Sequence, residues 1–146
     1  MKTFTLDEAQ ALLPLVESLI KRAIEKKQAA EEIEAELTEL SRRIFLSGGV
    51  YVDIAKVAAR RATMEEFVKL ARETVAEIDE IGVQVKDLDS GLLDFPCRMD
   101  DEIVLLCWKL GESSIEFWHT EDAGFAGRQP LDDRLRRRSG SSNRPN

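Results

Sequence analysis

The sequence has few of the residues from which disulfide frameworks, metal clusters and aromatic cores are built. It holds two cysteines and one histidine, and aromatic residues make up only 6% of it while charged residues make up 34%. This balance favours long, solvent-exposed helices over a sandwich or a barrel. Two cysteines cannot form the disulfide framework of a small secreted domain, so we expect reduced thiols and a cytoplasmic protein.

Long apolar runs are also missing, and none approaches the roughly 20 residues that span a bilayer. The segment Met1-Lys2-Thr3-Phe4 leads into polar sequence without the apolar centre of a signal peptide, so we expect no membrane association. Residues 132–146 hold five arginines and two aspartates, which leaves 16 basic and 26 acidic residues in 1–131. An acidic body disfavours nucleic acid as a partner.

The first third of the chain has the apolar spacing of one long helix. Thr5 and Glu8 form a capping box, in which each side chain accepts a hydrogen bond from the other residue's backbone N–H. The apolar positions that follow predict a helix over about 5–46, with a heptad seam in its second half. Pro14 lies inside this helix, and we expect it to kink the helix or to split off its first two turns.

A second helical pattern follows a short glycine turn at residues 47–49. It covers about 50–81 and stops at Gly82. Two long helices joined by a short turn form an antiparallel hairpin, here with coiled-coil spacing.

After Gly82 the apolar period becomes that of short strands. Residues 83–119 predict three or four antiparallel strands, with turns at Asp100-Asp101 and near Glu112. We therefore predict an α+β fold, with the small sheet packed on the base of the hairpin. The expected single domain covers 1–131 and includes a loop over 120–131. The basic tail 132–146 is too polar to order itself, and we expect disorder there.

A two-residue turn at Asp100-Asp101 sets a strand register. It places Asp94 opposite Cys107, and a second turn at Glu112 places Leu105 opposite His119. Asp94, Cys107 and His119 then share one face of the sheet. The backbone spacing puts Asp94 and His119 about 10–12 Å apart, too far for one metal ion unless a loop residue bridges them.

The remaining aromatic and sulfur side chains have mainly structural interpretations. Cys107 is expected to be buried and inert, and Cys97 lies on the opposite face, which argues against a disulfide. Trp108 and Trp118 share a face and are expected to pack on the helices. A tryptophan-lined ligand pocket is the alternative.

Two loops contain residues that bind ions in other proteins. The segment 87–91 begins like a calcium loop, but its twelfth position is Arg98 where a bidentate glutamate is needed, so a simple turn fits better. The segment 124–128 could present backbone N–H groups and a guanidinium to an anion. No helix is evident after it, and a glycine loop held by Phe125 is the simpler interpretation.

Motifs spread over residues 3–131 resemble a prokaryotic domain-of-unknown-function family, the one numbered 2203. The resemblance implies a bacterial cytosolic protein and no particular activity. It rests on these residues in combination: Phe4-Thr5-Leu6, Glu8-Ala9, Leu12-Leu13-Pro14, Gly82, Lys86-Asp87-Leu88-Asp89, Gly91, Asp94-Phe95-Pro96, Leu106-Cys107-Trp108, Gly111-Glu112, Trp118-His119 and Gly124-Phe125-Ala126-Gly127-Arg128.

Two classes of function follow. The first is a non-enzymatic interaction or assembly module, because no nucleophile–base pair or complete set of ligand spacings is visible. It would form a homodimer through apolar residues at the hairpin tip, namely Phe45, Leu46, Val50 and Tyr51, or bind another protein there.

The second class is a metal- or small-molecule-binding domain that could be hydrolytic. A divalent metal is the cofactor that this class would use. Its candidate metal ligands are Asp87, Asp89, Asp94, Glu112 and His119. Its candidate ligand-binding residues are Asp94, Glu112, Trp118, His119 and Arg128.

Overall fold

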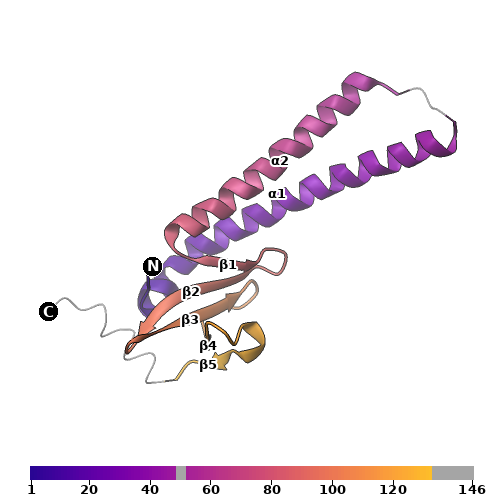
Figure 1. The fold of residues 1–146 in the computed structure, drawn as a ribbon. Coiled ribbons are helices and arrows are strands. Elements are labelled where there is room, and N and C mark those ends of the chain that lie inside the picture. Colours follow the sequence, from indigo (N-terminus) through magenta and orange to yellow (C-terminus); the bar gives the residue numbers. More distant parts are fainter. Residues whose placement is uncertain (49–51, 133–146) are drawn as a thin grey trace. The chain divides into compact units, whose positions relative to one another are not determined.

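A computed structural model describes residues 1–48 and 52–132 of the chain. Two helices pack together and an antiparallel sheet follows them, which confirms the predicted α+β class (Figure 1). Residues 133–146 of the predicted tail lie outside the described residues, as do Val50 and Tyr51. The elements in chain order are α1 (Leu6–Leu46), α2 (Ile54–Ile81), β1 (Gln84–Asp87), β2 (Leu92–Met99), β3 (Glu102–Lys109), β4 (Phe117–Thr120), a 3-10 helix (Phe125–Gly127) and β5 (Gln129–Pro130).

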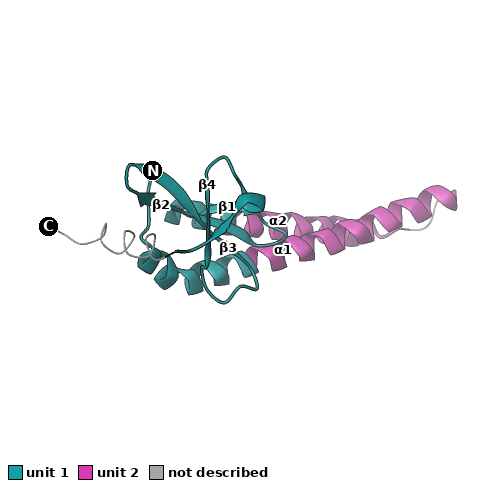
Figure 2. Cartoon of the chain, turned by 90° about the horizontal axis from the view of Figure 1, so that it is seen from below, with its two compact units in different colours: residues 1–21, 75–146 teal, residues 22–74 magenta. Residues whose placement is uncertain are grey.

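The chain divides into two compact units, coloured teal and magenta in Figure 2. Unit 1 joins residues 1–21 to the chain from Val75 onward, so it holds the sheet with the first turns of α1 and the last of α2. Unit 2 is residues 22–74, the remainder of the helical hairpin. No helix in the described ranges has the length and apolar character that crossing a membrane requires.

The start of α1 is built as its sequence predicts. The Thr5 backbone N–H donates to Glu8 Oε1 at 2.8 Å, and the Glu8 N–H donates to Thr5 Oγ1 at 3.1 Å. This reciprocal pair satisfies two donors that the first turn of a helix leaves open. The helix continues through Pro14 from Leu6 to Leu46, so the proline does not split off its first turns.

The turn between the helices ends later than predicted, so the second helix also begins later. Gly48 has the left-handed φ of 72° that a helix C-terminus favours in glycine. The second helix begins at Ile54 and not near Val50, because Asp53 caps it: the Lys56 N–H donates to Asp53 Oδ1 at 3.2 Å.

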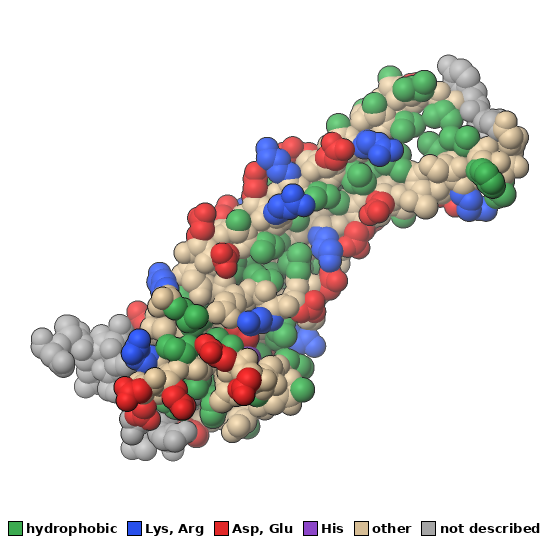
Figure 3. Space-filling view, in the orientation of Figure 1, with side chains coloured by type: hydrophobic (Ala, Val, Ile, Leu, Met, Phe, Trp, Pro, Cys, Tyr) green, Lys and Arg blue, Asp and Glu red, His purple; other side chains and the backbone are tan. Residues whose placement is uncertain are grey.

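Unit 2 combines polar and apolar contacts between its two helical segments. Arg60 on α2 donates to both carboxylate oxygens of Glu36 on α1. Phe45, Leu46 and Ile54 lie where the described helices approach the turn, and they are 84%, 65% and 80% exposed. Figure 3 shows apolar side chains in green at this end of the hairpin.

The sheet has strand order β1-β2-β3-β4-β5 and is antiparallel throughout. The predicted register is confirmed, since Asp94 pairs with Cys107 and Leu105 with His119. The fifth strand is an addition to the predicted three or four. It consists of Gln129–Pro130, in a segment expected to be loop. The sequence could not predict it, because a two-residue strand is too short to show the alternating apolar pattern of a strand.

Unit 1 joins the sheet to the start of α1 through contacts far apart in sequence. The Gln10 side-chain amide both donates to the Ile115 carbonyl at 3.0 Å and accepts from the Ile115 N–H at 3.1 Å. The Phe4 N–H donates to the Pro96 carbonyl at 2.7 Å, and the Phe4 ring meets Phe95 edge-on. One face of the sheet, with Phe95 and Trp108 fully buried, therefore supplies much of the core.

Candidate functional site

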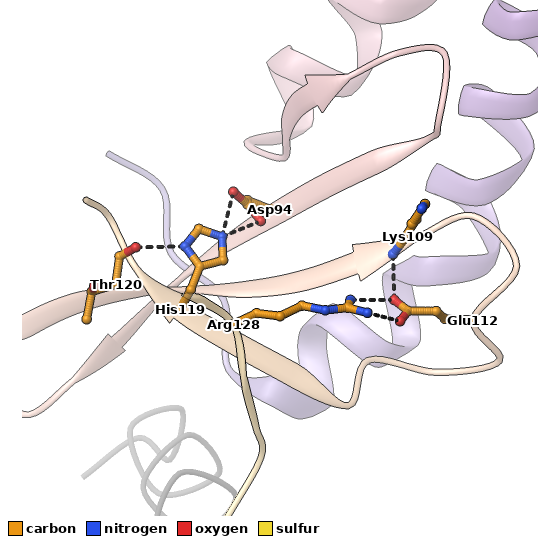
Figure 4. Close-up of polar contacts among 6 residues, drawn as sticks. All are labelled: Asp94, Lys109, Glu112, His119, Thr120 and Arg128. Carbon is orange, nitrogen blue, oxygen red and sulfur yellow. Dashed lines mark hydrogen bonds and ion pairs between the residues drawn. The ribbon is translucent and has the colours of Figure 1, made fainter. Parts of the chain in front are cut away.

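Two polar side chains meet at the centre of the sheet, where burial makes any polar group costly. His119 Nε2 lies 3.0 and 3.1 Å from the two carboxylate oxygens of Asp94, and the two residues are only 3% and 1% exposed. The expectation that Asp94 and His119 lie too far apart to share one ion without a bridging loop residue is therefore wrong. The 10–12 Å figure joins backbone positions, whereas the imidazole and the carboxylate reach toward one another across β3, the strand between them (Figure 4).

The hydrogen bonds fix where the protons of His119 lie. Nδ1 is 2.7 Å from the Thr120 carbonyl oxygen, which can only accept, so Nδ1–H is the donor. A second proton lies between Nε2 and the Asp94 carboxylate, because two acceptors would not approach to 3.0 Å without one. The pair is therefore neutral overall, which suits its burial.

Cys107 completes a cluster of three on this face. Its Sγ, one Asp94 oxygen and one His119 nitrogen all lie within 4.8 Å of one another, and Cys107 is fully buried. Burial and the nearby Asp94 carboxylate raise the pKa of the thiol to about 11, although Arg128 opposes the rise. A cysteine nucleophile needs a thiolate, and both His119 nitrogens already bond elsewhere, so cysteine–histidine catalysis is disfavoured.

An ion pair borders the cluster on the side of Cys107. Arg128 reaches Glu112 through two N···O contacts of 3.1 and 2.9 Å, and Glu112 also accepts from the Lys109 backbone N–H at 2.7 Å (Figure 4). The guanidinium carbon lies 4.0 and 4.4 Å from the ring centroids of Phe117 and Phe125. Burial is the largest single influence and lowers the pKa of Arg128, but the hydrogen bond and charge of Glu112, with smaller contributions from Cys107, together shift the pKa upward.

The other candidate residues lie apart from this cluster. Asp87 ends β1 and accepts from Ser90 in the turn that follows, and Asp89 lies exposed in that same turn. Trp118 faces the opposite side of the sheet, because neighbouring residues of a strand alternate. Its indole Nε1 is buried and, within the part of the chain that the structure describes, has no hydrogen-bond partner.

Cys107 is the cluster member that sequence reasoning passed over as a ligand. The predicted register already placed it between Asp94 and His119, and this was the available signal. Its apolar neighbours Leu106 and Trp108 instead predict a buried, unreactive thiol in the core. In the described ranges it belongs to the one group of three side chains whose ligand atoms come close enough for a metal ion.

The three donor atoms match the needs of a borderline transition metal. Ligand atoms in a tetrahedral zinc site are about 3.4–3.6 Å apart, because the metal–ligand bonds are about 2.0–2.3 Å long. The distances here, from 3.0 Å to within 4.8 Å, require only small side-chain shifts. A mixed sulfur, nitrogen and oxygen set suits Zn²⁺ and disfavours Mg²⁺ and Ca²⁺, which prefer oxygen ligands.

Comparison with known proteins gives a family and no function. No curated protein and no solved structure matches the chain. The model of one family, described as an uncharacterised conserved protein, matches residues 2–131 and so covers nearly all the described residues. The chain therefore belongs to the uncharacterised family DUF2203.

Proposed function

We propose that the protein binds one transition-metal ion, with Zn²⁺ as the best match, through Asp94, Cys107 and His119. The observation that carries the proposal is the buried meeting of three ligand atoms within 4.8 Å. The sequence alone favoured the assembly module over a metal-binding domain, because it shows no complete set of metal-ligand spacings. The three side chains come from three different strands, so no short motif could reveal them.

Charge and orientation both support this function. A divalent ion with a carboxylate, a thiolate and a neutral imidazole is electrically balanced, as a buried site requires. His119 already donates Nδ1–H to a backbone carbonyl, which leaves Nε2 to face the ion, as in most metal-binding histidines. Three protein ligands leave a fourth position for water or another small ligand. The buried free thiol of Cys107 suits the reducing cytoplasm, which we propose as its location.

The test is metal content and Co²⁺ binding in matched cysteine variants. The unmodified protein is expected to bind one Zn²⁺ or Co²⁺ per chain, and the Co²⁺ form to show thiolate-to-metal absorption. Cys107→Ala removes the thiolate and is expected to abolish that absorption and weaken binding by roughly 100-fold or more. Cys97→Ala is the control, because Cys97 is equally buried but pairs with Val104 outside the cluster.

Substoichiometric binding by the unmodified protein would contradict the proposal. So would unchanged affinity in both Cys107→Ala and His119→Ala. Asp94→Asn keeps the size of the side chain and removes its charge, so it is expected to weaken binding without removing the thiolate absorption.

The exposed tip of the hairpin supports a second function, assembly into a homodimer. Phe45, Leu46 and Ile54 present large, mostly exposed apolar side chains near the turn of unit 2, and exposed apolar patches usually mark an interface. We propose a second copy of the chain as its partner, because a two-fold pair buries the same patch on both chains.

Phe45→Glu tests this assembly. Light scattering at micromolar concentration is expected to give twice the 16.5 kDa chain mass for the unmodified protein and a shift toward monomer for the variant. Leu15→Glu is the control, since Leu15 is also exposed but lies in unit 1. A monomeric unmodified protein refutes the homodimer.

A further inference from the structure

A short segment separates the buried thiol from solvent. Residues 121–131, here called the strap, follow β4 and return along its outer edge. Arg128 is the strap residue that reaches inward, toward Cys107 and Glu112. Arg128 bonds to the fully buried Cys107 thiol and lies over the Phe117 ring, whose residue pairs with Cys107 across the sheet, so its partly exposed guanidinium covers the Cys107 side of the cluster.

Side-chain contacts fasten Arg128 firmly. Its guanidinium forms a two-point ion pair with Glu112 and is stacked between Phe117 and Phe125. Charge-assisted pairs of this geometry are among the stronger hydrogen bonds, and an arginine over aromatic faces gains further attraction. These contacts hold the closed position.

The backbone of the strap is held much more weakly. β5 pairs only Gln129 and Pro130 with β4, and the next backbone bond joins the Leu131 N–H to the Glu116 carbonyl at 2.9 Å. Residues 121–123 are exposed, as is Phe125. A segment with few buried contacts opens at a lower free-energy cost than the sheet beneath it.

We infer that the strap is a gate on the cluster, and that the Arg128–Glu112 pair is the latch that must release before an ion or reagent reaches Cys107. A gate that controls access to the metal site rests on the proposed function, metal binding. A buried metal site needs an entry path, and this segment supplies one without disturbing the strands that carry the ligands.

The test uses metal-free protein with Cys97→Ala, so that Cys107 is the single thiol. Arg128→Ala is expected to raise the rate of alkylation by iodoacetamide roughly tenfold or more, and Glu112→Gln to raise it in the same direction. Removing a cation from beside a thiol disfavours the reactive thiolate, so a merely electrostatic role for Arg128 predicts slower labelling. Arg98→Ala, an exposed arginine change on β2, is the control and is expected to have no effect.

Low concentrations of urea distinguish gate opening from global unfolding. Labelling through the gate is expected to be nearly independent of urea, whereas labelling through global unfolding rises steeply with it. An unchanged or slower rate in Arg128→Ala, or a steep urea dependence, overturns the gate. Faster labelling with no metal binding would leave the gate standing and refute the proposed function. Stoichiometric metal binding with an unchanged labelling rate in Arg128→Ala would support the proposed function and refute the gate.

Discussion

Replacement of His119 by leucine is expected to lower the free energy of unfolding of the metal-free protein by about 3–5 kcal/mol. The variant leaves Asp94 only 1% exposed and without the ring nitrogen that contacts both its oxygens. A buried carboxyl group that loses its partner keeps the full cost of its removal from water. Urea denaturation of the two proteins measures the difference.

The matched control removes both members of the pair. Asp94→Leu with His119→Leu deletes the polar groups together, and its cost is expected to be well below the sum of the single changes. Additive costs would show that Asp94 and His119 do not stabilise one another. A loss under about 1 kcal/mol for His119→Leu alone would contradict the buried pair.

Saturation with Zn²⁺ is expected to stabilise the protein by about 4 kcal/mol when the free ion is at about 1,000 times its Kd. For a chain of this length that corresponds to a rise in Tm of roughly 10 °C. The ion binds the folded arrangement of Asp94, Cys107 and His119, which the unfolded chain does not hold together. Thermal unfolding followed by circular dichroism, with and without Zn²⁺, measures the effect.

The two cysteine variants again serve as the comparison. Cys97→Ala is expected to keep the rise in Tm, and Cys107→Ala to lose most of it. An equal rise in both variants would mean that the ion stabilises the protein from another place on the chain.

The register of the sheet could be predicted from sequence, whereas the contact across it could not. A two-residue turn at Asp100-Asp101 sets which residues face one another, and the structure agrees at Asp94 and Cys107. The length and direction of side chains set the gap between Asp94 and His119. Backbone spacing contains neither quantity, so it could not predict that the imidazole and the carboxylate approach to 3.0 Å.

Local capping signals were informative at one helix and overlooked at the other. Thr5 and Glu8 marked the start of α1 correctly. Asp53 carried a comparable signal for α2, but the prediction used only the apolar spacing from Val50. The latch formed by Arg128 and Glu112 had no such local signal, because its members lie 16 positions apart across loop and strand.

The bond between Gln10 and Ile115 has a consequence for the order in which the protein can form during synthesis. The two residues are 105 positions apart, so the first turns of α1 wait for this bond until most of the described chain has been made. At about 5–20 residues per second the ribosome needs on the order of 5–20 s to cover that distance. Residues 22–74 can pair as a hairpin well before then, because they form a compact unit of their own. The nascent chain therefore carries an early helical hairpin and an N-terminal segment whose bonds to Ile115 form only after that residue has left the exit tunnel.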